Sequence, residues 1–327
     1  MSLRWPFKRA ESAHQLVVSW SEGVLVYVRA HLREDCAYQV TQSGVEHQGG
    51  DSLESFVRRL QGLGLKGQQA RAMLRPAQYQ FIQVEAPAVP PEELRSAARY
   101  LIKDRLESPL DELTLDIMRV GDGLQNGAGH LFVAAAPNEM LKSIIELSDA
   151  MQWSVQIIDI GEASQRNIQL ALAGREAVQF QGDVALFFSD ERQVLLTVSA
   201  HQELYYSRRL ELPEGLFSST QLSSSTPLLG LSDLEDDPLA QRFVADIQRS
   251  LDALRRTWSS ISTESMQVFA AQRSKEVSAW LGQQLGLKVD ALDAKTLFPG
   301  FEDIASAHQV LCLPLLGALL RTESRVL

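Results

Sequence analysis

A pattern of three short strands appears twice in this chain, once near its start and once just past its middle. In both copies the strands are β-prone and the turns between them are short, as at Gly23 in the first copy. A chain that begins the same meander twice is most simply built as two related halves, which predicts a duplicated architecture. The expected strands are 15–18, 24–29 and 38–45 in the first copy, and 183–188, 193–199 and 203–210 in the second.

Strands and helices alternate in the rest of the chain. A helix over 51–63 is expected to begin at an N-cap provided by Asp51 or Ser52. Alternation of this kind predicts an α/β protein built of layered sheets and helices. The other expected strands are 70–74, 79–84, 113–120, 130–135, 155–160, 265–270 and 288–291. The other expected helices are 92–106, 138–151, 239–258, 275–285 and 308–321, together with one that follows the strand at 155–160 and ends at 173.

The helix expected over 92–106 carries a basic stripe. Its inward face is expected to hold Leu94, Ala98 and Leu101. Three basic side chains follow i, i+4 spacing on its outward face, namely Arg95, Arg99 and Lys103.

The length of 327 residues suits about two domains of roughly 150 residues each. We expect an N-terminal domain over 13–174, with a subdomain inserted at about 77–136, and a C-terminal domain over 175–321. A Ser-rich loop is expected at 217–237, where Pro227 and an acidic run argue against regular structure. Short tails at 1–12 and 322–327 complete the division.

Composition excludes several classes of protein. With 31 basic and 41 acidic residues the net charge is −10, and such a surface repels phosphate backbones, so nucleic acid is not an expected partner. Two distant cysteines, Cys36 and Cys312, cannot form a disulfide framework and fit a reducing compartment. The longest apolar run, over 310–320, contains Pro314 and is shorter than the roughly 20 residues that a bilayer requires. We therefore expect a cytoplasmic protein.

The first residues mix cations with aromatic rings. Cations and rings together suit a headgroup layer, which predicts a peripheral contact with a membrane; a frayed tail in solvent is the simpler alternative. The residues concerned are Arg4, Trp5, Phe7, Lys8 and Arg9.

Motifs for catalysis or metal binding are missing from the sequence. The string Gly62-x-Gly64-x-x-Gly67 follows a helix and precedes a strand, the reverse of the order in a dinucleotide site, so we interpret it as a helix C-terminal turn. Gln68 and Gln69 stand where a P-loop needs Lys and Ser or Thr. The six histidines are scattered singly, which predicts no metal site, and no nucleophile elbow occurs.

One segment is similar to a known family. The run LRPAQYQFIQVEAPAVPPEEL at 74–94, followed by Leu106-Glu-Ser-Pro109 and Leu115-Asp116, resembles the PilM-like type IV pilus-assembly proteins, most of all their MSHA-pilus (MshI-type) branch. The likeness continues in order along nearly the whole chain, at 155–159, 207–208, IQRSLD at 247–252 and LPLLGALLR at 313–321.

The resemblance implies the actin-like ATPase fold, with two ribonuclease H-like domains around a cleft. Nucleotide-binding members hold phosphate with a D-x-G turn in each opening hairpin and adenosine with a late G-G pair. Here the first turn reads Ser19-Trp20-Ser21, the second reads Phe187-Phe188-Ser189, and Ala271-Gln272 replaces the G-G pair. Without carboxylates and glycines at these places, and with Trp20 and Phe187 or Phe188 filling the cleft, we expect that no nucleotide cofactor is bound and that the protein is not an enzyme.

The function implied is that of a non-catalytic scaffold at the cytoplasmic face of the inner membrane. Its expected partner is a PilN-like (MshJ-like) bitopic protein whose cytoplasmic tail docks in a groove of the N-terminal domain, with the assembly ATPase as a further partner. The basic stripe of Arg95, Arg99 and Lys103 is a candidate contact for an acidic tail, and a solvated helix face is the alternative. Two rival functions stay open: a nucleotide-binding, switching PilM-like protein and a GspL-like platform subunit of type II secretion.

Overall fold

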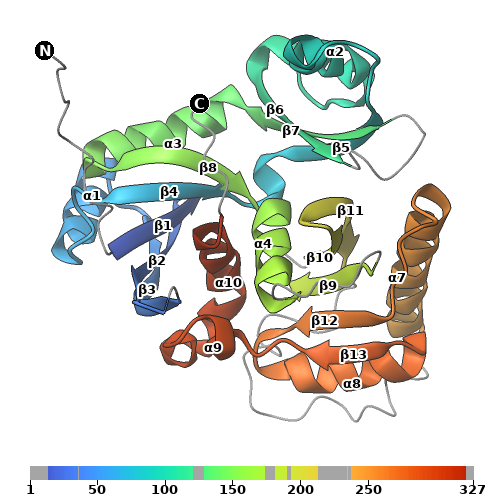
Figure 1. The fold of residues 1–327 in the computed structure, drawn as a ribbon. Helices are drawn as coiled ribbons and strands as arrows, with labels where there is room; N and C mark the ends of the chain where they lie inside the picture. Colours follow the sequence, from blue (N-terminus) through green and yellow to red (C-terminus); the bar gives the residue numbers. More distant parts are fainter. Residues whose placement is uncertain are drawn as a thin grey trace, which may run out of the picture.

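The computed structural model describes residues 14–35, 37–120, 129–173, 181–189, 193–212, 234 and 237–321. Their N-terminal part forms a sheet of order β3-β2-β1-β4-β8, at the left of Figure 1. The first three strands run antiparallel, and β4 and β8 continue parallel to β1. The strands are β1 (His14–Ser21), β2 (Val24–Leu32), β3 (Tyr38–His47), β4 (Gln69–Leu74) and β8 (Ser154–Ile160).

Two helices cover the outer face of this sheet, α1 (Leu53–Gly62) and α3 (Asn138–Met151). The Oγ atom of Ser52 accepts a hydrogen bond from the N–H of Ser55 at 3.2 Å, so Ser52, one of the two expected N-caps, begins α1. Gly64 and Gly67 follow the helix with φ angles of 76° and 69°. The glycine string is therefore a turn after a helix, as predicted, and not a phosphate loop.

The C-terminal part forms a second sheet, of order β11-β10-β9-β12-β13. Here too the opening meander is antiparallel and the last two strands are parallel to its first strand. The long helix α7 (Pro238–Thr257) and helix α8 (Ser274–Leu285) pack against it, with Phe243, Ile247 and Trp280 fully or almost fully buried. The strands are β9 (Asp183–Phe188), β10 (Gln193–Ala200), β11 (Glu203–Glu211), β12 (Ser265–Phe269) and β13 (Lys288–Ala291).

The two sheets thus share strand order and strand direction. In each, the first strand of the meander is central, its hairpin partners extend to one edge, and the two later strands extend to the other. The duplication predicted from the repeated meander is confirmed by this topology.

Two helices lie between the sheets, α4 (Gly161–Ala173) and α10 (Gln309–Leu319) (Figure 1). Helix α10 is almost entirely apolar, and Leu313 and Leu316 join Val17 of the first sheet and Phe187 of the second in one buried cluster. Helix α4 is polar yet buried over 161–169. Side chains of both domains therefore contribute to one buried cluster.

A small subdomain sits above the two domains in Figure 1. It is an antiparallel sheet of order β5-β7-β6 with helix α2 (Leu94–Leu101) on one face. The other face carries the stacked rings of Phe81 and Phe132, whose centroids are 4.8 Å apart, and Phe132 belongs to the core of the C-terminal domain. The strands are β5 (Gln80–Glu85), β6 (Leu113–Val120) and β7 (His130–Pro137).

The helix predicted over 92–106 is wrong in its extent. Three separate pieces replace it: a 3₁₀ turn at Pro91–Glu93, α2 itself, and a second 3₁₀ turn at Lys103–Arg105. Ile102 is fully buried whereas Leu101 is 49% exposed, because Ile102 lies four residues after Ala98 on the same helical face. Leu101 was therefore assigned to the inward face in error.

The closing helix is also shorter than expected. A 3₁₀ turn at Ser306–His308 precedes α10, and a one-turn helix α9 (Ala294–Leu297) lies before it. No helix within the described residues is long and apolar enough to cross a membrane. The N-terminal tail, the glycine-rich connection over 121–128, nearly all of the Ser-rich loop at 217–237 and the tail at 322–327 lie outside the described residues.

Candidate functional site

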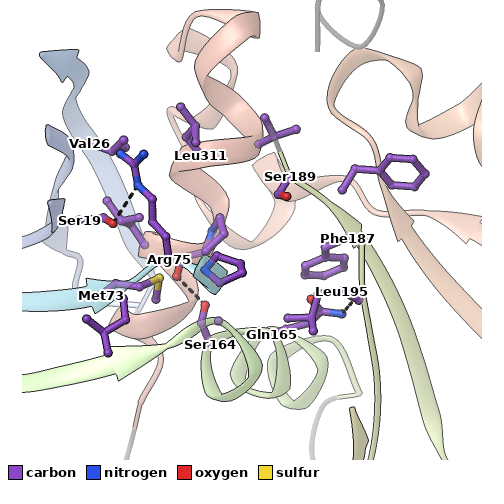
Figure 2. A pocket seen from close by; sticks show the side chains of 17 residues that line it. Ser19, Val26, Met73, Arg75, Ser164, Gln165, Phe187, Ser189, Leu195 and Leu311 are labelled. Atoms are coloured by element: carbon purple, nitrogen blue, oxygen red, sulfur yellow. Dashed lines mark hydrogen bonds between the residues drawn. The ribbon is translucent and has the colours of Figure 1, made fainter. Parts of the chain in front are cut away.

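A cleft opens between the two domains where the central strands of both sheets end. Figure 2 shows Ser19 and Arg75 on the side of the first sheet, Phe187 and Ser189 on the side of the second, and Ser164 and Gln165 of α4 beneath them. The ends of β1 and β9, where related nucleotide-binding proteins hold phosphate, therefore meet at one cleft. The cavity between them has a volume of only about 80 Å³, whereas ligand sites typically measure about 300–1,000 Å³.

Arg75 fills the first side of this cleft. Its Nε donates to Ser19 Oγ at 3.4 Å (Figure 2), and its Nη2 donates to the carbonyl of Val24 at 3.3 Å. Its backbone N–H donates to Gln78 Oε1 at 2.8 Å, which holds the residue at the end of β4. A cationic side chain thus lies directly against the first meander turn.

Two phenylalanines form the opposite side. Phe187 and Phe188 are 6% and 2% exposed, so both are part of the protein's core as well as of the cleft wall. The ring of Phe187 meets that of Phe269 edge to face at a centroid distance of 6.1 Å, and Phe188 meets Phe243 at 6.2 Å. Phe187 thus joins the core shared by both domains, whereas Phe188, the next residue of the strand, packs with Phe243 in the core of the C-terminal domain.

The floor of the cleft is tied to both domains through α4. Ser164 Oγ donates to the carbonyl of Pro314 at 2.5 Å, and Gln165 Nε2 donates to the carbonyls of Ala185 and Leu195 at 3.0 and 2.9 Å. Because each of these polar groups has a partner within the protein, the floor is a closed hydrogen-bonded surface.

Trp20 does not fill the cleft, contrary to expectation. Successive side chains of a strand point to opposite faces, so Trp20 points away from the face of Ser19. Its ring packs at a tilt against Phe56 of α1, with the ring centroids 5.5 Å apart. The sequence Ser19-Trp20-Ser21 is the end of β1, and the turn itself is Glu22-Gly23. Ser21 is buried but does not line the cleft.

Ala271 and Gln272, which were expected to replace the adenosine-binding G-G pair, lie between β12 and α8 and outside the cleft lining. Ala271 has a φ angle of +48°, a left-handed conformation that favours glycine, and Gln272 Nε2 donates to Ser306 Oγ. The backbone thus keeps a glycine-type turn although an alanine occupies it.

A second group of polar residues, which was not expected from the sequence, joins the domains just beside the cleft. Tyr79 and Glu162 are buried, and Tyr79 Oη donates to Glu162 Oε2. Arg209 of β11 donates to Glu162 Oε1 from Nε and Nη2, at 3.1 and 2.9 Å. Its guanidinium also stacks over the Tyr79 ring at 4.3 Å. We call these three residues the junction cluster.

The electrostatics of the junction cluster agree with its geometry. Burial and the neighbouring Glu162 carboxylate raise the pKa of Tyr79 well above its ordinary value. The pKa of Arg209 is raised as well, because the nearby Tyr79 and Glu162 outweigh the effect of burial. The cluster is therefore a buried ion pair with an additional hydrogen bond from a neutral tyrosine.

The junction cluster borders a groove of about 450 Å³, which we call the junction groove. Its walls come from the segment 76–82, from Glu107 and Ser108, and from the ends of β6 and β7. Arg105 and Arg209 also line it. Polar and charged side chains thus line the groove together with apolar ones, and its volume is within the range of binding sites.

The basic stripe does not form a single free surface. Arg95 is exposed and bonded to Asp116 at 2.6 Å, and Arg99 donates to the carbonyl of Leu110 at 2.5 Å. Lys103 lies beyond the end of α2, in the next 3₁₀ turn. Arg4, Trp5, Phe7, Lys8 and Arg9 lie outside the described residues.

Metal or thiol chemistry finds no support in the described part of the chain. No group of three or more His, Cys, Asp or Glu side chains is arranged there to hold an ion. Burial raises the pKa of the Cys312 thiol to about 12, so this cysteine stays protonated and inert.

The topology and the two-domain cleft define an actin-like ATPase fold. A solved structure of the PilM-PilN type IV pilus biogenesis complex is similar, with a TM-score of 0.67 at 16% identity, covering 94% of this chain and 99% of that one. The cytoplasmic domain of EpsL, an inner-membrane component of the Vibrio cholerae type II secretion system, matches with a TM-score of 0.44 at 12% identity over 66% of this chain and 78% of that one. No protein-family model and no curated protein sequence matches the chain.

Proposed function

We propose that this protein is a non-catalytic scaffold of a type IV pilus assembly machine of the MSHA type, located in the cytoplasm at the inner membrane. Its proposed partner is the cytoplasmic tail of a PilN-like (MshJ-like) bitopic protein, and the assembly ATPase is a second candidate partner. The observation that carries the proposal is the small cleft volume of about 80 Å³ in a fold whose similar neighbour is a pilus biogenesis complex.

The cleft supports the non-catalytic part of this proposal. A nucleotide needs room between the two meander turns, backbone N–H groups that approach its phosphates, and a carboxylate to manage Mg²⁺. Instead, Arg75 bonds to Ser19 on one side and Phe187 packs into the core on the other. In this structure the space left between the two sides is only about 80 Å³.

The junction groove supports the docking part. Its volume of about 450 Å³ is within the range of binding sites, and all of its lining except Arg209 comes from the N-terminal domain and its subdomain. The arginines of the basic stripe are a weaker candidate, since Arg95 and Arg99 already bond to neighbours. We therefore place the tail in the junction groove.

The two rival functions differ in what they require. A switching PilM-like protein needs nucleotide to enter the cleft, so it predicts that nucleotide binds. A GspL-like platform subunit predicts association with type II secretion components rather than with pilus proteins. The resemblance to the MSHA branch favours the pilus.

The test is a titration of the purified protein with a synthetic peptide, monitored by fluorescence anisotropy. The peptide has the sequence of the cytoplasmic tail of a candidate PilN-like protein. We expect saturable binding that is weakened at least tenfold by Ala77→Arg, which places a long charged side chain at an exposed position of the groove lining. Ile145→Arg, on the exposed face of α3 far from the groove, is the matched control. Absence of binding to any PilN-like tail contradicts the docking function.

A further inference from the structure

The junction groove is built by both domains, although nearly all of its lining belongs to one. Arg209, on the edge strand β11 of the second sheet, reaches across to the segment that links β4 to the subdomain. Its Nη1 donates to the carbonyls of Pro76 at 2.6 Å and Tyr79 at 3.1 Å. The same two residues line the groove, so one side chain of the C-terminal domain fixes the backbone of the groove wall.

Arg209 is fixed in turn by α4. Glu162, which is 1% exposed, accepts two hydrogen bonds from Arg209 and one from Tyr79 Oη, and the N–H of Gly161 donates to Tyr79 Oη at 3.1 Å. The cluster therefore joins three units: the groove wall, the helix between the sheets, and the second domain. The hydrogen bonds of Glu162 to Tyr79 and to Arg209 each join two of these units.

We propose that docking in the junction groove requires the two domains to be closed, with Arg209 as the positioning residue that transmits closure to the groove. The inference rests on the proposed function, because it concerns the same groove. If the domains separate, Arg209 leaves Pro76 and Tyr79, and the groove wall loses two of the bonds that hold its shape. A tail that binds the groove only when the domains are closed therefore shifts the equilibrium toward the closed state.

The linkage operates in both directions. A docked tail holds the domains closed, and anything that weakens closure reduces the affinity for the tail by the same factor. Glu162 provides the means to separate this effect from direct contact, because it is part of the cluster but is not in the groove lining. A substitution of Glu162 changes closure without removing a groove contact.

The experiment measures tail-peptide affinity and domain separation together. Spin labels at Glu54→Cys of α1 and Lys275→Cys of α8, both exposed, report the distance between the domains in a Cys36→Ser background. Cys312 is buried and does not react. The variants are Glu162→Gln and Arg209→Lys, with Arg208→Lys as the matched control, since Arg208 pairs with Asp246 on α7 instead.

We expect the peptide to narrow the distribution of label distances in the wild type. Glu162→Gln and Arg209→Lys should each weaken peptide binding at least fivefold and broaden the distribution, whereas Arg208→Lys should change neither. Unchanged affinity in Glu162→Gln, or a distance distribution that the peptide does not alter, overturns the inference and leaves the docking function standing. Failure of the wild type to bind the peptide overturns both.

Discussion

The cleft and the junction groove lie side by side, share Pro76 in their linings, and differ in almost every physical property. The cleft measures about 80 Å³ and is closed by phenylalanines that belong to the protein's core. The groove measures about 450 Å³, and its polar groups come from the linking segment, the subdomain and the C-terminal domain. We propose that the protein has lost the central site of its fold because core side chains occupy it, while the neighbouring groove has stayed open.

Substitution of Phe187 should give the largest change in stability, and it tests whether core side chains close the cleft. We expect Phe187→Ala to lower the free energy of unfolding by about 3–5 kcal/mol, because it deletes a buried ring from the shared core. Urea denaturation measures the change. Ser189→Ala, on the same wall, removes one hydroxyl hydrogen bond and should cost only about 0.5–1.5 kcal/mol. A loss below about 1 kcal/mol in Phe187→Ala would show that the ring is not part of the packed core.

The junction cluster should give the next largest effect. Glu162→Gln replaces the buried carboxylate that accepts bonds from Arg209 and Tyr79, and we expect a loss of about 1.5–3 kcal/mol in the free energy of unfolding. Asp252→Asn, which touches only an exposed pair with Arg255, is the control and should change stability by less than about 1 kcal/mol. Equal effects of the two substitutions would mean that the cluster does not hold the domains together.

The third expected change is at Ala271, which was expected to replace a glycine of an adenosine-binding turn. Ala271→Gly should leave stability unchanged or raise it by up to about 1 kcal/mol, because glycine relieves the left-handed strain at φ +48° while adding freedom to the unfolded chain. Ala270→Gly, at φ −134°, relieves no such strain and should be destabilising. Thermal unfolding of the pair decides the sign, and a clear loss in Ala271→Gly counts against a glycine-type turn.

Arg95 should give the smallest effect. Its bond to Asp116 is exposed, so Arg95→Ala is expected to change stability by about 0–1 kcal/mol. If the tail lies in the junction groove, the same substitution leaves the peptide dissociation constant within twofold of the wild type. A tenfold loss of affinity in the anisotropy titration would move the docking site to the basic stripe.

The sequence predicted the sheets better than the sites because the two depend on different kinds of pattern. Periodic apolar residues act locally, and the strands over 183–188 and 288–291 and the helix over 138–151 coincide with the structure. The end of α2 was missed because Leu101 and Ile102 are both apolar, and only the position of the core shows which one is buried. Local patterns cannot supply that information.

The candidate site was predictable only in part, for a related reason. Resemblance to a family marked Ser19, Phe187 and Ser189, and these residues do line one cleft. It misplaced Trp20, since strand alternation turns that ring toward Phe56. Tyr79, Glu162 and Arg209 are distant in sequence and carry no motif, and the one available hint was a glutamate and several other polar residues in the helix that ends at 173. Tertiary contacts alone bring the junction cluster together.

The central claim is that the cleft does not accept nucleotide, and isothermal titration with Mg-ATP tests it most directly. The same preparation is first titrated with the tail peptide, which shows that the protein is folded and competent to bind. We expect no binding heat from Mg-ATP at concentrations up to the millimolar range, because the space between Arg75 and Phe187 is too small. A dissociation constant in the micromolar range would contradict the account.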